Sequence, residues 1–191
     1  MRKLFLQINM SLDGFIEDVS GEIDWHFADR EFDEFILETL RSIDAMIFGR
    51  VAYQKLAEYW PTAATGPDAS ELDIEVARLV NGLPKYVVSH HLAHADWNNS
   101  HIIRGDVAER IGQLKQQPGQ DIALFAGAGA ATTFTRLGLI DEYRIIVNPA
   151  LLGAGTPLFK GGYRRTELKL LRTRPFKNGS VVLYYAPVQV G

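Results

Sequence analysis

Short apolar runs alternate with stretches of helical periodicity along most of this 191-residue chain. Apolar runs with the length of buried strands occupy residues 3–10, 45–48, 86–89, 122–125 and 143–148. Helical patterns between them cover residues 29–40, 50–57, 70–82, 106–114 and 128–138. Strands that alternate with helices form a parallel sheet with helices packed on its faces. The pattern therefore predicts a three-layer α/β/α fold with a mostly parallel central sheet.

Two further strand-like runs near the C-terminus, 167–173 and 181–186, flank the tripeptide Lys177-Asn178-Gly179. Asn-Gly is typical of tight hairpin turns, because both residues tolerate positive φ. We therefore expect an antiparallel hairpin at one edge of the sheet. No repeat divides the chain, so residues 1–191 are expected to form one domain, with 61–68 as its least ordered segment.

The composition is that of an ordinary soluble globular protein, with 47% hydrophobic and 23% charged residues. A formal net charge of -3 gives no reason to expect a nucleic-acid partner. The chain has no cysteine, which excludes disulfides and thiolate chemistry and fits a reducing cytoplasm. Because no apolar run approaches the roughly 18 residues of a membrane span, we expect a cytoplasmic protein without a membrane partner.

The run 124–132 passes from a strand-like pattern into small residues and then into a helical pattern. Its small residues are Gly127, Ala128, Gly129, Ala130 and Ala131. Small side chains let a phosphate reach the unpaired N–H groups at a helix N-terminus, where the helix dipole favours negative charge. Close packing between a strand and a helix needs small residues too. The run thus indicates either a nucleotide site or a packing turn.

Polar residues also follow other predicted strands. Asn9 ends the first strand, Gly49-Arg50 follows the strand at 45–48, and Ser89 closes the strand at 86–89. Ligands of open α/β sheets gather at the carboxyl ends of the strands, and the Arg50 guanidinium could hold a phosphate there. For either Arg50 or Ser89 alone, a surface ion pair or an ordinary strand-end hydroxyl is the competing interpretation. Their shared placement favours a common site.

Four segments together resemble a known family: MSLDGFI at 10–16, IFGRVAY at 47–53, KYVVS at 85–89 and FAGAG at 125–129. Their order is that of the dihydrofolate reductase-like superfamily. Two more segments, LIDEYR at 139–144 and PALLGAGTPLF at 149–159, are typical of the branch containing the reductase domain of bacterial riboflavin biosynthesis. The resemblance spans nearly the whole chain. It implies a dihydrofolate reductase-like fold, an NADPH-dependent reductase and a homodimer, for which the strands after Tyr143 are the candidate contact.

The resemblance also implies a role for each matching position. Arg50, beside Gly49, would bind the 2′-phosphate or a neighbouring phosphate, and Ser89 would lie on the adenosine side. Main-chain groups of Asn9 would meet the nicotinamide carboxamide. The pyrophosphate would be held by backbone N–H groups of the run Gly127, Ala128, Gly129, Ala130 and Ala131.

Three details of the resemblance concern individual residues. Relatives often have a cis peptide within the glycine pair, so we predict one between Gly127 and Ala128. They commonly place Thr at the position of Ala52, so one phosphate ligand is missing here. The methyl group of Ala128 also crowds the approach of a phosphate.

Reduction of a C=N or C=O bond needs a proton donor as well as a hydride. The resemblance places that acid on the first helix, where Asp33 is the nearest candidate; the competing interpretation is a solvated side chain beside Glu31 and Glu34. Asp13 is a second candidate at the substrate, although Asp-Gly in a loop is more often turn chemistry. Trp25 could cover the substrate or could simply pack within its loop.

Closely spaced histidines at 90, 91, 94 and 101 could in principle ligate a metal. Adjacent histidines point apart and no carboxylate motif accompanies them, so we expect no metal site. The basic residues between 164 and 177 alternate with apolar ones and indicate a solvated strand face.

These observations support an enzyme that uses NADPH to reduce a small heterocyclic substrate, pterin- or pyrimidine-like, or another small carbonyl or imine. A module that kept the nucleotide cleft and lost the chemistry, acting as a sensor or scaffold, is the alternative. A pure interaction protein is a third hypothesis, and it predicts no dinucleotide binding.

Overall fold

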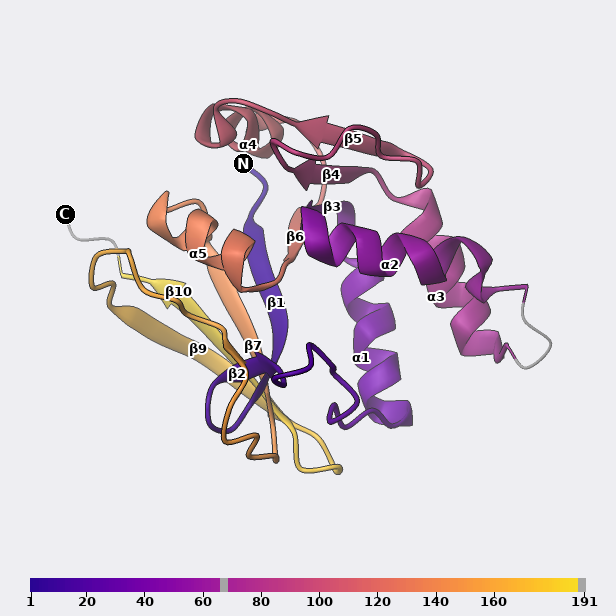
Figure 1. The fold of residues 1–191 in the computed structure, drawn as a ribbon, viewed down its shortest axis with the longest axis vertical. Coiled ribbons are helices and arrows are strands. Elements are labelled where there is room, and N and C mark those ends of the chain that lie inside the picture. Colours follow the sequence, from indigo (N-terminus) through magenta and orange to yellow (C-terminus); the bar gives the residue numbers. More distant parts are fainter. Residues whose placement is uncertain (66–68, 189–191) are drawn as a thin grey trace.

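The computed structural model describes residues 1–65 and 69–188 (Figure 1). Its centre is an eight-stranded sheet with the order β5-β4-β3-β6-β1-β7-β10-β9. The strands of this sheet are β1 (Leu4–Ser11), β3 (Ile43–Gly49), β4 (Lys85–Val88), β5 (Ser100–Ile103), β6 (Asp121–Phe125), β7 (Glu142–Asn148), β9 (Leu168–Pro175) and β10 (Val181–Pro187). The helices are α1 (Arg30–Arg41), α2 (Arg50–Ala63), α3 (Glu71–Gly82), α4 (Val107–Gln116) and α5 (Ala128–Arg136). A separate ribbon pairs β2 (Phe15–Glu17) with β8 (Thr156–Pro157).

The sheet is parallel from β5 to β7, and its last two strands are antiparallel. The turn between β9 and β10 contains Gly179 at φ 90°, a conformation that glycine adopts without strain. The predicted mostly parallel sheet and its antiparallel C-terminal hairpin are therefore confirmed.

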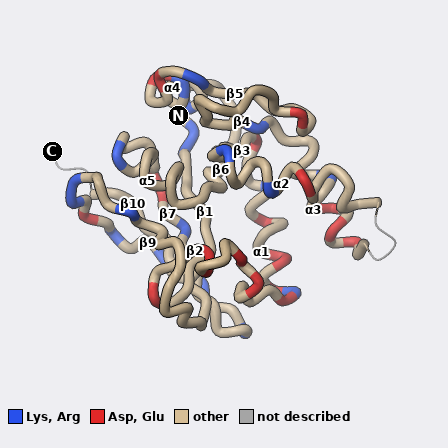
Figure 2. The backbone as a smooth tube through the Cα atoms, in the orientation of Figure 1, with Lys and Arg blue, Asp and Glu red and all other residues tan. Residues whose placement is uncertain are grey.

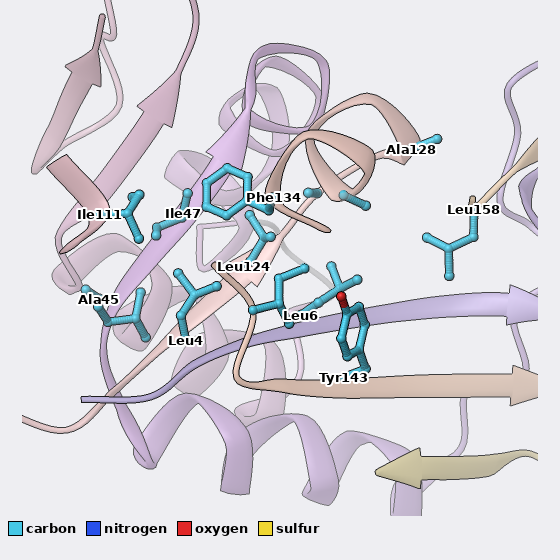
Figure 3. Close-up of a cluster of buried hydrophobic side chains, with 14 of the residues drawn as sticks. Leu4, Leu6, Ala45, Ile47, Ile111, Leu124, Ala128, Phe134, Tyr143 and Leu158 are labelled. Carbon is cyan, nitrogen blue, oxygen red and sulfur yellow. The ribbon is translucent and has the colours of Figure 1, made fainter. Parts of the chain in front are cut away.

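Helices cover both faces of the sheet. On one face, α4 and α5 bury Ile111 and Phe134 against Leu4, Leu6 and neighbouring strand residues (Figure 3). On the other face, α1, α2 and α3 pack against a second set of side chains, which includes Phe5 and Phe48. Because successive strand residues point to opposite faces, β1 supplies Phe5 to one layer and Leu6 to the other. The predicted three-layer arrangement follows from this alternation.

Side-chain caps close the starts of α1 and α3. The Asp29 carboxylate accepts a hydrogen bond from the N–H of Phe32 at 2.9 Å and starts α1. Ser70 and Asp73 form a capping box at the start of α3, in which the side chain of each accepts from the backbone N–H of the other. Both starts are therefore closed by a side chain.

Two predictions differ from the structure. β5 lies where no strand is predicted, because polar Ser100-His101 gives an edge strand little apolar signal, although Ile103 is buried. The helix predicted to end near residue 57 continues to Ala63 and carries Pro61 in its last turn. The Asn81 amide donates to the Trp60 carbonyl at 3.0 Å and helps to hold this turn. The segment expected to be least ordered therefore starts in a helix, and residues 66–68 of it lie outside the described residues.

Among the described residues, no helix is long and apolar enough to cross a bilayer. Figure 2 shows acidic residues along α1 and α3 and basic residues on α5 and around β9 and β10. Charge is therefore distributed unevenly over a chain whose net charge is small.

Candidate functional site

Connections that are far apart in the sequence surround one groove at the carboxyl ends of β3, β4 and β6. The groove has a volume of about 580 Å³. It is lined by most of the residues predicted to hold a cofactor, namely Gly49, Arg50, Ser89, Gly127, Ala128, Gly129 and Ala130. The structure therefore brings the β3–α2 turn, the end of β4 and the glycine/alanine turn to one place.

The start of α5 forms one wall of the groove. Gly127 is its N-cap residue, with φ −73° and ψ 175°, and no side chain caps this helix. The N–H groups of the first three helical residues have no carbonyl partner within a helix. They belong to Ala128, Gly129 and Ala130, which all line the groove. The first turn also has no acidic residue, so the helix itself supplies no negative charge at this positive end of its dipole.

The predicted cis peptide between Gly127 and Ala128 is wrong. No peptide bond among the described residues is cis. The extended dihedral angles of Gly127 lead through a trans bond directly into α5, and the Gly127 carbonyl accepts the first helical hydrogen bond, from the N–H of Ala131, at 3.1 Å. This turn therefore needs no cis bond to redirect the chain.

The start of α2 forms the facing wall. Its N-cap residue, Gly49, likewise has no side-chain cap, and the first turn of α2 carries no acidic residue. Arg50 is the first residue of this helix, and its exposed guanidinium donates to the Gln54 side chain at 2.9 Å. A Cβ atom at position 49 would lie 2.9 Å from the Cβ of Ala130. Gly49 therefore lets the two helix starts approach each other.

The two glycines of the glycine/alanine turn have a different explanation. A Cβ atom at Gly127 or at Gly129 would meet no protein atom within 4 Å, and neither residue has a positive φ. Neither protein packing nor backbone conformation requires glycine at these positions. The packing interpretation of this run therefore fails at its glycines, and the open space in front of them fits an anion that approaches the N–H groups.

Ser89 lies at the end of β4 and is buried. Its Oγ atom accepts hydrogen bonds from the N–H groups of His91 at 3.2 Å and Leu92 at 3.0 Å. The hydroxyl therefore shapes the turn after β4, and its proton is left to donate into the groove that Ser89 lines.

Two cations of the groove were missed from the sequence. Arg136 lies on the face of α5 that also carries Gly129 and Thr133, and Lys160 comes from the segment after β8. The spacing of 129, 133 and 136 is that of one helix face and could have shown Arg136. Lys160 had no such signal, because its loop approaches the groove only in the folded chain.

Two predicted cofactor residues lie outside the groove lining. Ala131 is fully buried, and its N–H is used by the Gly127 carbonyl, so its amide is not a free donor. Asn9 lies on β1 at the next strand end. The pairing of β1 with β6 ends at Leu6 and Leu124, so the main chain of β1 beyond Leu6 has no partner in β6. Main-chain groups at the position of Asn9 are thus open toward the end of β6.

Asp33 lies on α1 and is half-buried rather than fully solvated. Burial raises the pKa of its carboxyl, and the charges of Asp29 and Asp73 raise it further. A carboxyl with a raised pKa holds its proton to higher pH, as a general acid requires. Asp33 is not among the residues that line the groove between α2 and α5.

Asp13 takes part in turn chemistry. Its carboxylate accepts hydrogen bonds from the Ser11 hydroxyl at 2.6 Å, from Gly153 N–H at 2.7 Å and from Leu152 N–H at 3.1 Å. These bonds lower the pKa of Asp13, the Ser11 bond most of all. Asp13 therefore ties the turn after β1 to the loop after β7. Trp25 is half-buried and packs edge-on against His26, as the packing interpretation expects.

The histidines stay apart. Among the described residues, no three His, Asp or Glu side chains are grouped so that they could hold a metal ion. His90 lines the groove, and His101 stacks against Tyr86 with ring centroids 5.6 Å apart.

Comparison with known proteins identifies the family. A family model described as the RibD C-terminal domain matches residues 2–182. The chain belongs to this family. It is 37% identical over 186 residues to the uncharacterized protein YyaP of Bacillus subtilis (strain 168). The aligned region covers 96% of this chain and 94% of that protein. The resemblance inferred from the sequence motifs is therefore confirmed.

Solved structures show the same fold. A putative riboflavin biosynthesis protein from Shewanella sp. PV-4 has a TM-score of 0.73 at 20% identity, covering 99% of this chain and 100% of that chain. A dihydrofolate reductase from Enterococcus faecalis, complexed with NADP(H) and RAB-propyl, has a TM-score of 0.64 at 11% identity, covering 98% and 97%. The RibD C-terminal domain family thus shares a fold with a reductase, and this chain has that reductase-like fold.

Proposed function

We propose that this protein is an NADPH-dependent reductase of a small heterocyclic substrate, pterin- or pyrimidine-like, or of another small carbonyl or imine compound. The observation that carries the proposal is the pair of uncapped helix N-termini, α2 and α5, which face one groove beside Arg50. Two such starts offer unpaired N–H donors and positive dipole ends to the pyrophosphate of a dinucleotide.

The proposed cofactor residues then have roles set by their chemistry. Ala128, Gly129 and Ala130 donate their N–H groups to the pyrophosphate. Arg50 binds the 2′-phosphate, because a guanidinium can contact two phosphate oxygens at once. Ser89 donates its hydroxyl proton on the adenosine side. The main chain of Asn9 meets the nicotinamide carboxamide.

When bound, the reduced nicotinamide supplies a hydride to a C=N or C=O bond of the substrate. The neighbouring atom must then receive a proton, and we assign this step to Asp33, whose pKa is raised. The matched test replaces Asp33 with Asn and the exposed neighbour Glu34 with Gln. We expect Asp33→Asn to lose turnover by about 100-fold or more while NADPH binding is kept. Equal turnover in both variants would contradict the assignment of Asp33 as the proton donor and would favour the solvated interpretation.

Titration with NADPH and with NADH tests the cofactor assignment. We expect Arg50→Ala to weaken NADPH binding about tenfold or more and to leave NADH binding nearly unchanged, because only NADPH carries the 2′-phosphate. Arg30→Ala is the matched control, since Arg30 is also the first residue of its helix but lies at the capped start of α1. Equal effects of Arg50→Ala on both dinucleotides would contradict this assignment.

Oxidation of NADPH across a panel of heterocyclic and carbonyl substrates then separates the hypotheses. Tight NADPH binding without turnover on any substrate would favour the non-catalytic module. Ala52 supports this alternative, because relatives commonly have Thr at that position. Binding of neither dinucleotide would favour a pure interaction protein.

We also propose that the protein is a homodimer. The edge strand β9 exposes Leu168, Leu170 and Leu171 to solvent at 40%, 49% and 47% of their surface. A long edge strand with exposed apolar residues is an aggregation hazard unless a partner covers it. Light scattering on the wild type and on Leu170→Lys measures the oligomeric state, and we expect the variant to be monomeric.

A further inference from the structure

A second cavity, which we name the α5 cavity, lies at the C-terminal end of α5. It has a volume of about 500 Å³ and is lined by the end of this helix and by the segment that precedes β9. Arg136 is the one described residue that lines both this cavity and the groove. The α5 cavity therefore adjoins the groove but is a separate site.

Two of the residues that line the α5 cavity are arginines without a partner. Arg136 and Arg164 are both exposed, and neither guanidinium makes a hydrogen bond, an ion pair or a cation–π contact with any residue in 1–65 or 69–188. Every other arginine in that part of the chain contacts a carboxylate, a carbonyl or amide oxygen, or an aromatic ring. Two unpaired guanidinium groups at one cavity repel each other, and an anion between them removes this repulsion.

The other polar side chains of the α5 cavity carry no negative charge, since none of its lining residues is Asp or Glu. The Oγ1 atom of Thr135 accepts a hydrogen bond from the Tyr143 hydroxyl at 3.3 Å, so its own proton is left to donate into the cavity. The Thr166 hydroxyl donates to the Arg164 carbonyl at 3.1 Å and helps to hold the turn that carries this arginine. The cavity thus combines two cations with a hydroxyl donor.

The C-terminal end of α5 is closed by its own backbone. The N–H of Leu139 donates to the Phe134 carbonyl and the N–H of Gly138 to the Thr135 carbonyl, both at 3.1 Å. Gly138 has φ 65° and completes this Schellman motif. Two carbonyls at the negative end of the helix dipole are therefore already paired. The dipole would account for a cation in the last turn of α5, but not for Arg164, which belongs to no helix.

We propose that the α5 cavity is a second anion site, which binds a phosphoryl group between Arg136 and Arg164. A guanidinium contacts two oxygens of one phosphoryl group at once, and such charge-assisted bonds are about twice as strong as neutral ones. The cavity is larger than a phosphoryl group needs, and its volume lies in the range of about 300–1,000 Å³ that is typical of sites for small organic ligands. We therefore expect the ligand to be a small phosphorylated molecule. The site goes beyond the proposed function, because it does not depend on the identity of the groove's ligand.

Backbone amide shifts in two-dimensional NMR spectra locate the bound anion. The probes are glycerol 3-phosphate and inorganic phosphate, each titrated at constant ionic strength. Gly138 and Gly162 report on the α5 cavity, and Gly127 and Gly129 report on the groove. We expect shifts at Gly138 and Gly162 that saturate. Tighter binding of the ester identifies a phosphorylated small molecule as the ligand, and tighter binding of inorganic phosphate identifies the free ion.

Arg164 and its neighbour Arg165 provide a matched pair of variants. Both are exposed, but Arg165 pairs with Glu167 at 3.4 Å and does not line the cavity. We expect Arg164→Gln to raise the Kd of glycerol 3-phosphate about tenfold or more, because a hydrogen-bonded contact between two charged groups is lost. Arg165→Gln removes the same charge from the adjacent position and should leave the Kd near its wild-type value. The same spectra show whether each variant is folded.

A third variant separates the α5 cavity from the groove. Arg50→Gln removes a cation of the groove and should leave the Kd measured at Gly138 and Gly162 unchanged. Equal weakening by Arg164→Gln and Arg165→Gln would show only a diffuse effect of surface charge and would overturn the proposal. Shifts confined to Gly127 and Gly129, or no saturable shift with either probe, would overturn it as well.

Discussion

The five helices in the described part of the chain begin in two different ways. α1, α3 and α4 begin at Asp29, Ser70 and Asp106, whose side chains accept a hydrogen bond from the first turn, and each of these turns contains an acidic residue. α2 and α5 begin at Gly49 and Gly127, with neither a cap nor an acid. The two open starts face the same groove.

The capped starts contribute to the stability of their helices, whereas the open starts leave N–H donors unpaired. Relative to glycine, a side-chain cap stabilises a helix by only about a few tenths of a kcal/mol, so the two glycine starts forgo a small contribution that the other three obtain. The capped starts of α1 and α3 also bring Asp29 and Asp73 close enough to add to the effect of burial in raising the pKa of Asp33. The fold therefore has an acidic region at two capped starts and unpaired N–H donors at two open ones.

Adding a charged side-chain cap to the open start of α5 should have the largest effect on NADPH binding. In Gly127→Asp, the carboxylate would accept from the first turn of α5 and occupy the donors that we assign to the pyrophosphate. We expect NADPH binding to weaken about 100-fold or more, because like charges at contact cost several kcal/mol, while Tm rises. Fluorescence titration and thermal unfolding measure the two effects.

Gly127→Asn is the control for this substitution, because it supplies the same cap without the charge. A Cβ atom at position 127 meets no protein atom within 4 Å, so both variants should fold. If Gly127→Asp bound NADPH as tightly as the wild type, the anion assignment of this helix start would be wrong.

Separating the two open starts should have a smaller effect on binding. Gly49→Ala places a methyl group 2.9 Å from the Cβ of Ala130, so α2 and α5 must move apart. We expect a loss of about 1–3 kcal/mol in the free energy of unfolding. NADPH binding should weaken about tenfold, because one good hydrogen-bonding contact to an anion is worth about that much. Gly82→Ala, where a Cβ meets no atom within 4 Å, is the matched control.

Removing the side-chain cap of α3 should change the free energy of unfolding without changing NADPH binding. Ser70→Ala removes the hydroxyl that accepts from the N–H of Asp73 at 3.1 Å, and the start of α3 takes no part in the groove. We expect the free energy of unfolding to fall by about 1 kcal/mol and NADPH binding to stay at the wild-type value. Weaker NADPH binding in Ser70→Ala would mean that helix starts influence the groove through overall stability rather than by contact.

The sequence predicted the two open helix starts better than it predicted the hydrogen bonds between distant parts of the chain. Alternating patterns place Gly49, Ser89 and Gly127 at strand ends, and parallel strands bring these ends to one edge, so the groove could be anticipated. The bonds of Asp13 to Leu152 and Gly153 join residues about 140 positions apart, and no local pattern reports them. The hydrogen bond from the Asn148 amide to the Asn9 side-chain oxygen could not be predicted either, because the sequence does not distinguish a buried asparagine from any other polar residue at a strand end.

The smallest expected effect concerns the acidic region. A raised pKa means that folding favours protonated Asp33, so the stabilising contribution is fully present below the unfolded pKa of about 4 and is lost as the pH rises through the folded pKa. The amide introduced by Asp33→Asn cannot ionise, so this variant should gain in stability relative to the wild type between about pH 4 and pH 7. Denaturant unfolding of both proteins across this range measures the difference. A difference that does not change with pH would show that neither burial nor the charges of Asp29 and Asp73 raise the pKa of Asp33, and the contrast between the two kinds of helix start would then rest on the groove alone.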